Sequence, residues 1–283
     1  MSAPLHPLLF PLASGDNPID HIVAHPLPWD WKLGPVSISN QLFMLGVSAL
    51  LMLLVFPLAA RSKDRVPRGL RNLVESVLQF IREQVARPSL REATDRYVPF
   101  LWTVFFLVLF SNLLGMLPID PLLHAIGVPL TGAAGHLAVG GTPTGNLSIT
   151  AGLAVCSFVM IHVGGIREQG LVHYLKHFAP PVPWPLLFLL VPLEIVGSFV
   201  KPFALAIRLF ANMIAGHIVL AVVLGFTAIL AHGLSAGVAA IGLVSVLGAV
   251  ALSLLEIFVA FLQAYIFTYL TTLFVGMAVH PEH

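Results

Sequence analysis

Four charged side chains interrupt an otherwise apolar region near the end of the chain. Between residues 177 and 281, the charged side chains are Glu194, Lys201, Arg208 and Glu256. A charge at the centre of a membrane helix costs roughly 2.5–3.5 kcal/mol on insertion scales, so such residues are functional candidates by default. The chemistry that they suggest is the movement of charge through a hydrophobic layer.

Three of these residues share one face of a helix. Glu194, Lys201 and Arg208 follow one another at intervals of seven residues. Seven steps of about 100° return to nearly the same face, which Asn212 shares because it lies four residues beyond Arg208. His217 lies nine residues beyond Arg208, about 180° round the helix. The spacing predicts a polar stripe along an apolar helix.

A second polar face occurs on the last apolar segment, where Glu256 and Gln263 are also seven residues apart. If the two segments form antiparallel helices, Arg208 can lie level with Gln263. His217 then lies near Glu256, because offsets of nine and seven residues differ by only about 3 Å along the axis.

Structural explanations compete with these roles. Glu194 and Lys201 could extend from a helix end so that their charges reach water. Arg208 could form a buried salt bridge, although no acidic residue lies three or four positions from it. His217 could be a polar residue of the core.

The sequence gives little sign of disulfide, metal-binding or nucleotide-binding chemistry. The single cysteine, Cys156, allows neither an internal disulfide nor a Cys-rich metal site. The sequence contains no Walker A, HExxH or GxGxxG motif. We therefore expect no nucleotide site, no cofactor, no metal and no catalytic residue in this chain.

The composition indicates where these residues must lie. The 283 residues are 58% hydrophobic and only 10% charged, and the mean hydropathy is +0.93. A typical soluble domain carries about 25% charged residues. This composition excludes a disordered chain and a nucleic-acid-binding protein with a basic face. It predicts an all-α polytopic protein of the lipid bilayer.

About five membrane-embedded segments are expected within a single membrane domain, 37–283. They cover residues 38–60, 97–119, 146–164, 184–231 and 237–279. The last two exceed the ~20 residues needed to cross a bilayer, so each holds either two spans or one strongly tilted helix. Apolar residues at intervals of three and four predict an amphipathic surface helix over 67–87.

The charges predict an orientation. Nine of the 14 Lys and Arg residues lie between 61 and 96, which puts this segment in the cytoplasm. Residues 1–36 then form an irregular, non-cytoplasmic N-terminal arm, and the loop 120–145 lies on the same side. The first 31 residues contain no Lys or Arg, so no cleaved signal peptide is expected.

Residues 205–217, LAIRLFANMIAGH, resemble the signature of subunit a of the F-type ATP synthase. Other parts of 38–279 resemble further motifs of this family: Pro192-Leu193-Glu194, Lys201-Pro202, NLLGMLP at 112–118, NLSIT at 146–150 and LQAYIF at 262–267. The resemblance implies one outer span, a membrane-surface helix, a hairpin of two spans and two very long tilted helices.

The resemblance also implies a function. Subunit a is the non-catalytic, proton-conducting stator beside the rotating ring of c subunits, with two offset half-channels that couple proton flow to rotation and ATP synthesis. Its implied partners are the c-ring, b-type peripheral stalk subunits and the rest of the synthase, in a bacterial inner membrane. A self-contained secondary cation transporter or channel is the alternative, and an intramembrane enzyme is a third possibility.

Specific residues match the family's motifs. Arg208 matches its essential arginine, Gln263 the glutamine opposite it, and Asn212 the polar residue one turn further on.

His217 and Glu256 match the pair that lines the inlet half-channel. The acid and the histidine are exchanged relative to many bacterial members, so the main proton relay of the two stays open. Glu194 and Lys201 are expected along the outlet to the cytoplasm.

Overall fold

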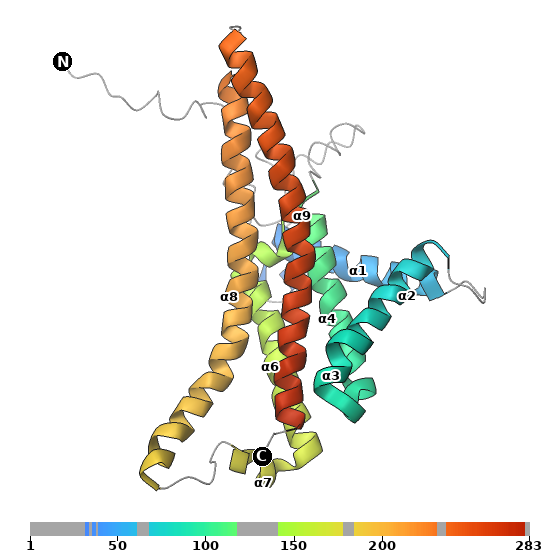
Figure 1. The fold of residues 1–283 in the computed structure, drawn as a ribbon, viewed down its shortest axis with the longest axis vertical. Coiled ribbons are helices and arrows are strands. Elements are labelled where there is room, and N and C mark those ends of the chain that lie inside the picture. Colours follow the sequence, from blue (N-terminus) through green and yellow to red (C-terminus); the bar gives the residue numbers. More distant parts are fainter. Residues whose placement is uncertain are drawn as a thin grey trace, which may run out of the picture.

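Five long apolar helices make up most of the structure, a computed structural model that describes residues 32–33, 36–37, 39–60, 68–117, 141–177, 184–230 and 236–280. Each is long and apolar enough to cross a membrane. They are α1 (Asn40–Ala60), α4 (Thr94–Gly115), α6 (Leu147–Gln169), α8 (Trp184–Leu230) and α9 (Ala236–Val279) (Figure 1). This architecture confirms the prediction of an all-α polytopic membrane protein.

The described part of the N-terminal arm contains two very short strands. β1 (Lys32–Leu33) pairs antiparallel with β2 (Val36–Ser37). The expectation of an irregular arm over 1–36 is therefore wrong at these residues, where an apolar residue in each pair suits a two-residue ladder. Residues 1–31 and most of the loop 120–145 lie outside the described residues.

The segment before α4, where a surface helix is predicted over 67–87, is continuously helical over 70–90 but irregular in hydrogen bonding. α2 (Leu70–Phe80) continues into a π-helical turn η1 (Ile81–Ala86), α3 (Arg87–Leu90) and a 3-10 turn η2 (Arg91–Ala93). Ile81, Val85 and Leu90 are buried, whereas Leu73 is exposed. The indole N–H of Trp102 on α4 donates to the carbonyl of Leu78 at 3.0 Å, which attaches α2 to the bundle.

α8 and α9 are single continuous helices. They contain 47 and 44 residues, which at 1.5 Å per residue gives lengths of about 70 and 66 Å. Both exceed the ~30 Å of a bilayer core, and the strong tilt expected from the sequence stays a prediction. Of the two arrangements open from the sequence, two spans in each segment is wrong.

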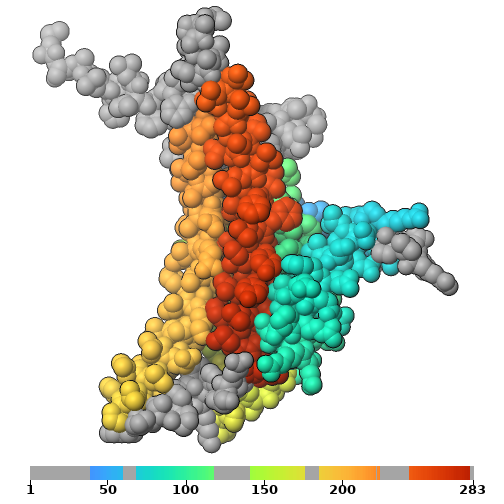
Figure 2. Space-filling model, in the orientation of Figure 1, coloured from blue at the N-terminus to red at the C-terminus, as the bar shows by residue number. Residues whose placement is uncertain are grey.

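α8 changes direction along its length. It runs beside α9 through the upper and middle parts of the molecule and diverges from it at the lower end (Figures 1 and 2). Pro192 and Pro202 lie inside this helix. A proline removes a backbone hydrogen bond and clashes with the preceding turn, which bends a helix. The divergence leaves room between α8 and α9 for side chains from α6 and α7.

The core lies where α4 and the α2–α3 segment meet α8 and α9. Its largest fully buried side chains include Leu101 on α4, Leu209 on α8 and Phe267 on α9. Gly276 lets α9 approach the α3 segment, because a Cβ there would lie 2.7 Å from the carbonyl oxygen of Ser89. These contacts fix α9 against the bundle and thereby fix the height of its polar side chains.

Candidate functional site

His217 on α8 and Glu256 on α9 face each other. Nδ1 of His217 lies 3.4 Å from Oε1 of Glu256, and the two side chains are 19% and 10% exposed. The structure therefore brings together the two residues that the antiparallel alignment puts at similar heights. Glu256 Oε1 is buried and has no hydrogen-bond partner among the described residues. Such an oxygen requires water or a proton to satisfy it.

Gly216 makes this close approach possible. A Cβ at this position would lie 3.0 Å from Oε1 of Glu256 and 3.4 Å from its Cδ. Because glycine has no side chain, the carboxyl group of Glu256 can lie directly against the backbone of α8. The glycine next to His217 is thus part of the space that holds the pair.

A loop before α6 contributes a polar partner that sequence reasoning missed. Thr142 precedes the 3-10 turn η3 (Pro143–Gly145), and its hydroxyl is in hydrogen-bond contact with Nε2 of His217. Both ring nitrogens of His217 therefore face polar groups. Gly115 at the end of α4 lies beneath Thr142, since a Cβ there would be 2.5 Å from the Thr142 Cα.

The same loop is anchored to α4 by buried polar side chains. The hydroxyl of Thr144 donates to Oδ1 of Asn112 at 2.6 Å, and Nδ2 of Asn112 donates to the carbonyl of Ala260 on α9 at 3.3 Å. Both Thr144 and Asn112 are fully buried. The motif NLLGMLP, which begins at Asn112, was the available sequence signal, but nothing in it pointed to Thr142 or Thr144.

Asn212 and Gln263 join α8 to α9 one helical turn beyond Arg208. Nδ2 of Asn212 donates to Oε1 of Gln263 at 2.9 Å. Gln263 is 2% exposed, whereas Arg208 and Asn212 are exposed. The sequence expectation put Gln263 level with Arg208, and the structure gives its direct hydrogen bond to Asn212. Arg208 and Asn212 lie on the exposed side of α8, which we call its open face.

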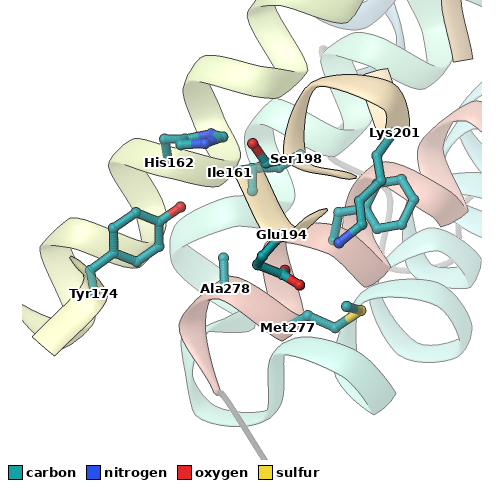
Figure 3. A pocket seen from close by; sticks show the side chains of 9 residues that line it. Ile161, His162, Tyr174, Glu194, Ser198, Lys201, Met277 and Ala278 are labelled. Carbon is teal, nitrogen blue, oxygen red and sulfur yellow. The ribbon is translucent and has the colours of Figure 1, made fainter. Parts of the chain in front are cut away.

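Glu194 and Lys201 line a cavity of about 60 Å³ at the lower end of α8. Nζ of Lys201 lies 5.5 Å from the centre of the Phe274 ring on α9, within cation–π range. Figure 3 shows both side chains directed into the space between the helices, together with Ser198. They form a second polar region, separate from the pair His217 and Glu256.

The two polar regions lie on opposite sides of Arg208 along α8. Lys201 precedes Arg208 by seven residues and His217 follows it by nine. At 1.5 Å per residue, these offsets are about 10 and 14 Å along the axis. The arginine therefore separates two polar regions at different depths of one helix.

Comparisons with known proteins identify the family. The family model described as ATP synthase A chain matches residues 42–276. The chain belongs to this family. It is 43% identical over 88% of its length to ATP synthase subunit a of Myxococcus xanthus, of which the match covers 75%.

Two further relatives give the same family. The chain is 38% identical over 86% of its length to ATP synthase subunit a 2 of Chlorobaculum tepidum, covering 63% of that protein. It is 39% identical over 94% of its length to ATP synthase subunit a of an Anaeromyxobacter species, covering 60% of that protein. The chain thus spans less than two thirds of these two relatives. With five apolar helices long enough to span a membrane among its described residues, it is a multi-pass membrane protein.

Proposed function

We propose that this chain is the proton-conducting stator subunit of an F-type ATP synthase in a bacterial inner membrane. The observation that carries the proposal is the arrangement on α8, where one exposed arginine separates two polar regions at different depths. In this arrangement each region is one half-channel, and neither crosses the membrane alone. Protons then pass from one region to the other on the carboxylates of a rotating c-ring.

His217 and Glu256 form the inlet. A proton arriving through water can bind the Glu256 carboxylate or a ring nitrogen of His217. The two groups lie 3.4 Å apart, so the proton can pass from one to the other. The hydroxyl contact of Thr142 with Nε2 holds the ring and offers a group that can both donate and accept a proton. Next, the proton moves to a carboxylate of the c-ring, which can enter lipid only when it is neutral.

Arg208 makes the exchange directional. Its positive charge lowers the pKa of a nearby carboxylate of the c-ring, so that carboxylate releases its proton on the outlet side. It also repels a hydrated proton and prevents a direct leak between the half-channels. Arginine suits this position better than lysine, since a guanidinium does not lose its proton inside a protein.

Glu194, Ser198 and Lys201 form the outlet, which opens to the cytoplasm. The same end of the molecule carries Arg96 on α4, whose guanidinium pairs with Glu168 on α6. Basic residues between 61 and 96 support a cytoplasmic location for this end by the positive-inside rule. By the same argument, the N-terminal arm is non-cytoplasmic.

The open face around Arg208 suits a closely approaching helix of the c-ring. Ala204, Ala211 and Ala215 are exposed at helical intervals around Arg208, and small side chains let membrane helices approach closely. α8 and α9 lie side by side along one long surface of the molecule (Figure 2). We assign the chain no nucleotide site, and b-type stalk subunits complete its expected partners.

The test uses Arg208→Ala in vesicles that contain the whole complex. ATP-driven proton pumping should vanish, while passive proton uptake by the membrane sector survives or increases, because the barrier charge is gone. Arg68→Ala is the matched control, since Arg68 is exposed outside the helices and its loss should leave both rates unchanged. Normal pumping by Arg208→Ala would overturn the proposal and favour a self-contained secondary cation transporter or channel.

A further inference from the structure

The cavity at the lower end of α8 has a second wall, for which the resemblance assigns no residue. α6 contributes His162 and α7 (Leu171–His177) contributes Tyr174 to the lining. In Figure 3 the His162 ring lies on the side of Ser198, and Tyr174 lies on the side of Glu194. The lining from α9 consists of Phe274, Met277 and Ala278, none of which titrates. Titratable groups from three helices therefore share one small space.

The ring of His162 is held in a defined state. Its Nδ1 lies 2.9 Å from the carbonyl oxygen of Phe158 on the preceding turn. Because a carbonyl can only accept, Nδ1 carries the hydrogen and donates it. In the neutral ring, Nε2 is then the nitrogen with a free lone pair. The rings of Phe158 and Tyr174 lie 3.9 and 6.0 Å away, centre to centre, so they restrict its position.

Tyr174 is positioned by the turn that ends α6. Gly170 has a φ of +81°, a conformation that glycine adopts readily, and it begins the reversal into α7. Gly165 then receives the Tyr174 ring, because a Cβ there would collide with it. Tyr174 is 7% exposed, and its hydroxyl points toward the other side chains of the cavity (Figure 3). Burial, and to a smaller extent the negative charge of Glu194, raise the pKa of Tyr174, so it stays a neutral hydroxyl.

The cavity is large enough for water. Its volume is about 60 Å³, whereas roughly 10–15 Å³ of such volume suffices for one water molecule. A buried water also needs two to four polar partners. The side chains of His162, Tyr174, Glu194 and Ser198 can supply them. A short chain of waters can thus connect the α6–α7 wall with Glu194.

We propose that His162 is a further proton-relay residue of the outlet half-channel, and that Tyr174 holds the water chain between it and Glu194. The inference rests on the proposed function of the chain. Nε2 accepts the transported proton from a protonated cavity water, which becomes neutral, and the imidazolium then gives the proton from Nε2 to the next water or to the Glu194 carboxylate. The N–H at Nδ1 stays in place, so the ring returns to its neutral state unchanged.

The test is His162→Gln in vesicles that contain the whole complex, with ATP-driven pumping as the readout. Glutamine keeps polarity and approximate size but cannot relay a proton at neutral pH. We expect the rate to fall about tenfold, less than the ~100-fold or more that a proton-transfer group can contribute to a reaction, because water carries part of the flux. Added imidazole should restore the rate. His162→Glu, which restores a titratable group, should retain more of it.

His173→Gln is the matched control. His173 lies on α7 beside Tyr174 but is exposed and does not line the cavity, so its rate should not change. Tyr174→Phe keeps the ring against Gly165 and removes only the hydroxyl. It should cause a smaller decrease that imidazole does not correct, because imidazole does not replace a fixed hydroxyl.

The outcomes separate this inference from the function on which it rests. An unchanged rate in His162→Gln overturns the relay, and so does a lower rate that imidazole and His162→Glu both fail to restore, since that pattern indicates a purely structural role. If Arg208→Ala abolishes pumping in the same preparation, the proposed function stands even when the relay fails. If Arg208→Ala also pumps normally, both are overturned.

Discussion

Asn212 on α8 donates a hydrogen bond of 2.9 Å to Gln263 on α9, one helical turn from Arg208. Gln263 is buried while Asn212 lies at the open face. The bond therefore adds to the packing of buried Leu209 in holding the rotation of α8 about its axis at the height of Arg208. Hydrogen bonds between membrane helices contribute only about 0.6 kcal/mol on average, so this bond matters more for the direction of the arginine than for stability.

A double-mutant cycle tests this role. Asn212→Leu and Gln263→Leu should each lower ATP-driven proton pumping, since each frees α8 to rotate, and the double variant should be no worse than the poorer single variant. The free energy of unfolding of the complex should change by about 1 kcal/mol or less. Losses that add across the two sites would mean that the side chains act independently, and the positioning role would then be wrong.

Gly216→Ala should slow proton uptake by way of the inlet. The new methyl group would lie 3.0 Å from Glu256 Oε1, so the carboxyl group has to move away from His217. Gly197→Ala on the same helix is the control, because nothing lies within 4 Å of a Cβ there. Alanine favours a helix by about 1 kcal/mol over glycine, so a general loss of helix stability cannot explain a decrease. Equal rates in the two variants would contradict the close contact at Gly216.

Regular helix geometry explains which parts of the site were predictable. The proximity of His217 and Glu256 follows from a fixed rise of 1.5 Å per residue on two antiparallel helices, so residue spacing alone indicates it. The same alignment of the two helices puts Asn212 and Gln263 within hydrogen-bond reach of each other. The continuity of α8 and α9 did not follow, because segments that are apolar on all sides have no periodicity that distinguishes one helix from two.

Contacts that depend on loops and bends were not predictable. Thr142 reaches His217 from an uncharged, Gly- and Pro-rich part of the chain, where no periodicity relates a residue to the helices. The lower cavity depends on the divergence of α8 near its two prolines and on the reversal after Gly170. Neither the angle of a bend nor the path after a reversal is encoded in residue spacing. His162 and Tyr174 consequently had no visible link to Glu194.

Thr142→Val should weaken proton uptake, whereas Thr142→Ser should preserve it. Valine has nearly the shape of threonine but lacks the hydroxyl that contacts Nε2 of His217, and serine retains that hydroxyl. Loss of one neutral hydrogen bond is worth about 1 kcal/mol, which corresponds to roughly a fivefold change in the population of the held ring. Passive proton uptake by the membrane sector measures the effect. A serine variant as poor as valine would assign the loss to packing against Gly115 instead.

Exchanging the two inlet residues tests whether the pair or its order matters. His217→Glu alone puts two carboxyl groups in contact, and one of them must then stay protonated. Glu256→His alone leaves two imidazoles and no acid. We expect each to lower ATP-driven pumping by at least about tenfold, toward the ~100-fold or more that a proton-transfer group can contribute. The double variant restores one acid and one imidazole across the same 3.4 Å contact, and Thr142 can donate to a carboxylate at position 217. It should therefore recover most of the rate. A double variant as slow as either single one would show that the proton must meet the histidine from α8 and the acid from α9, so that the order is part of the mechanism.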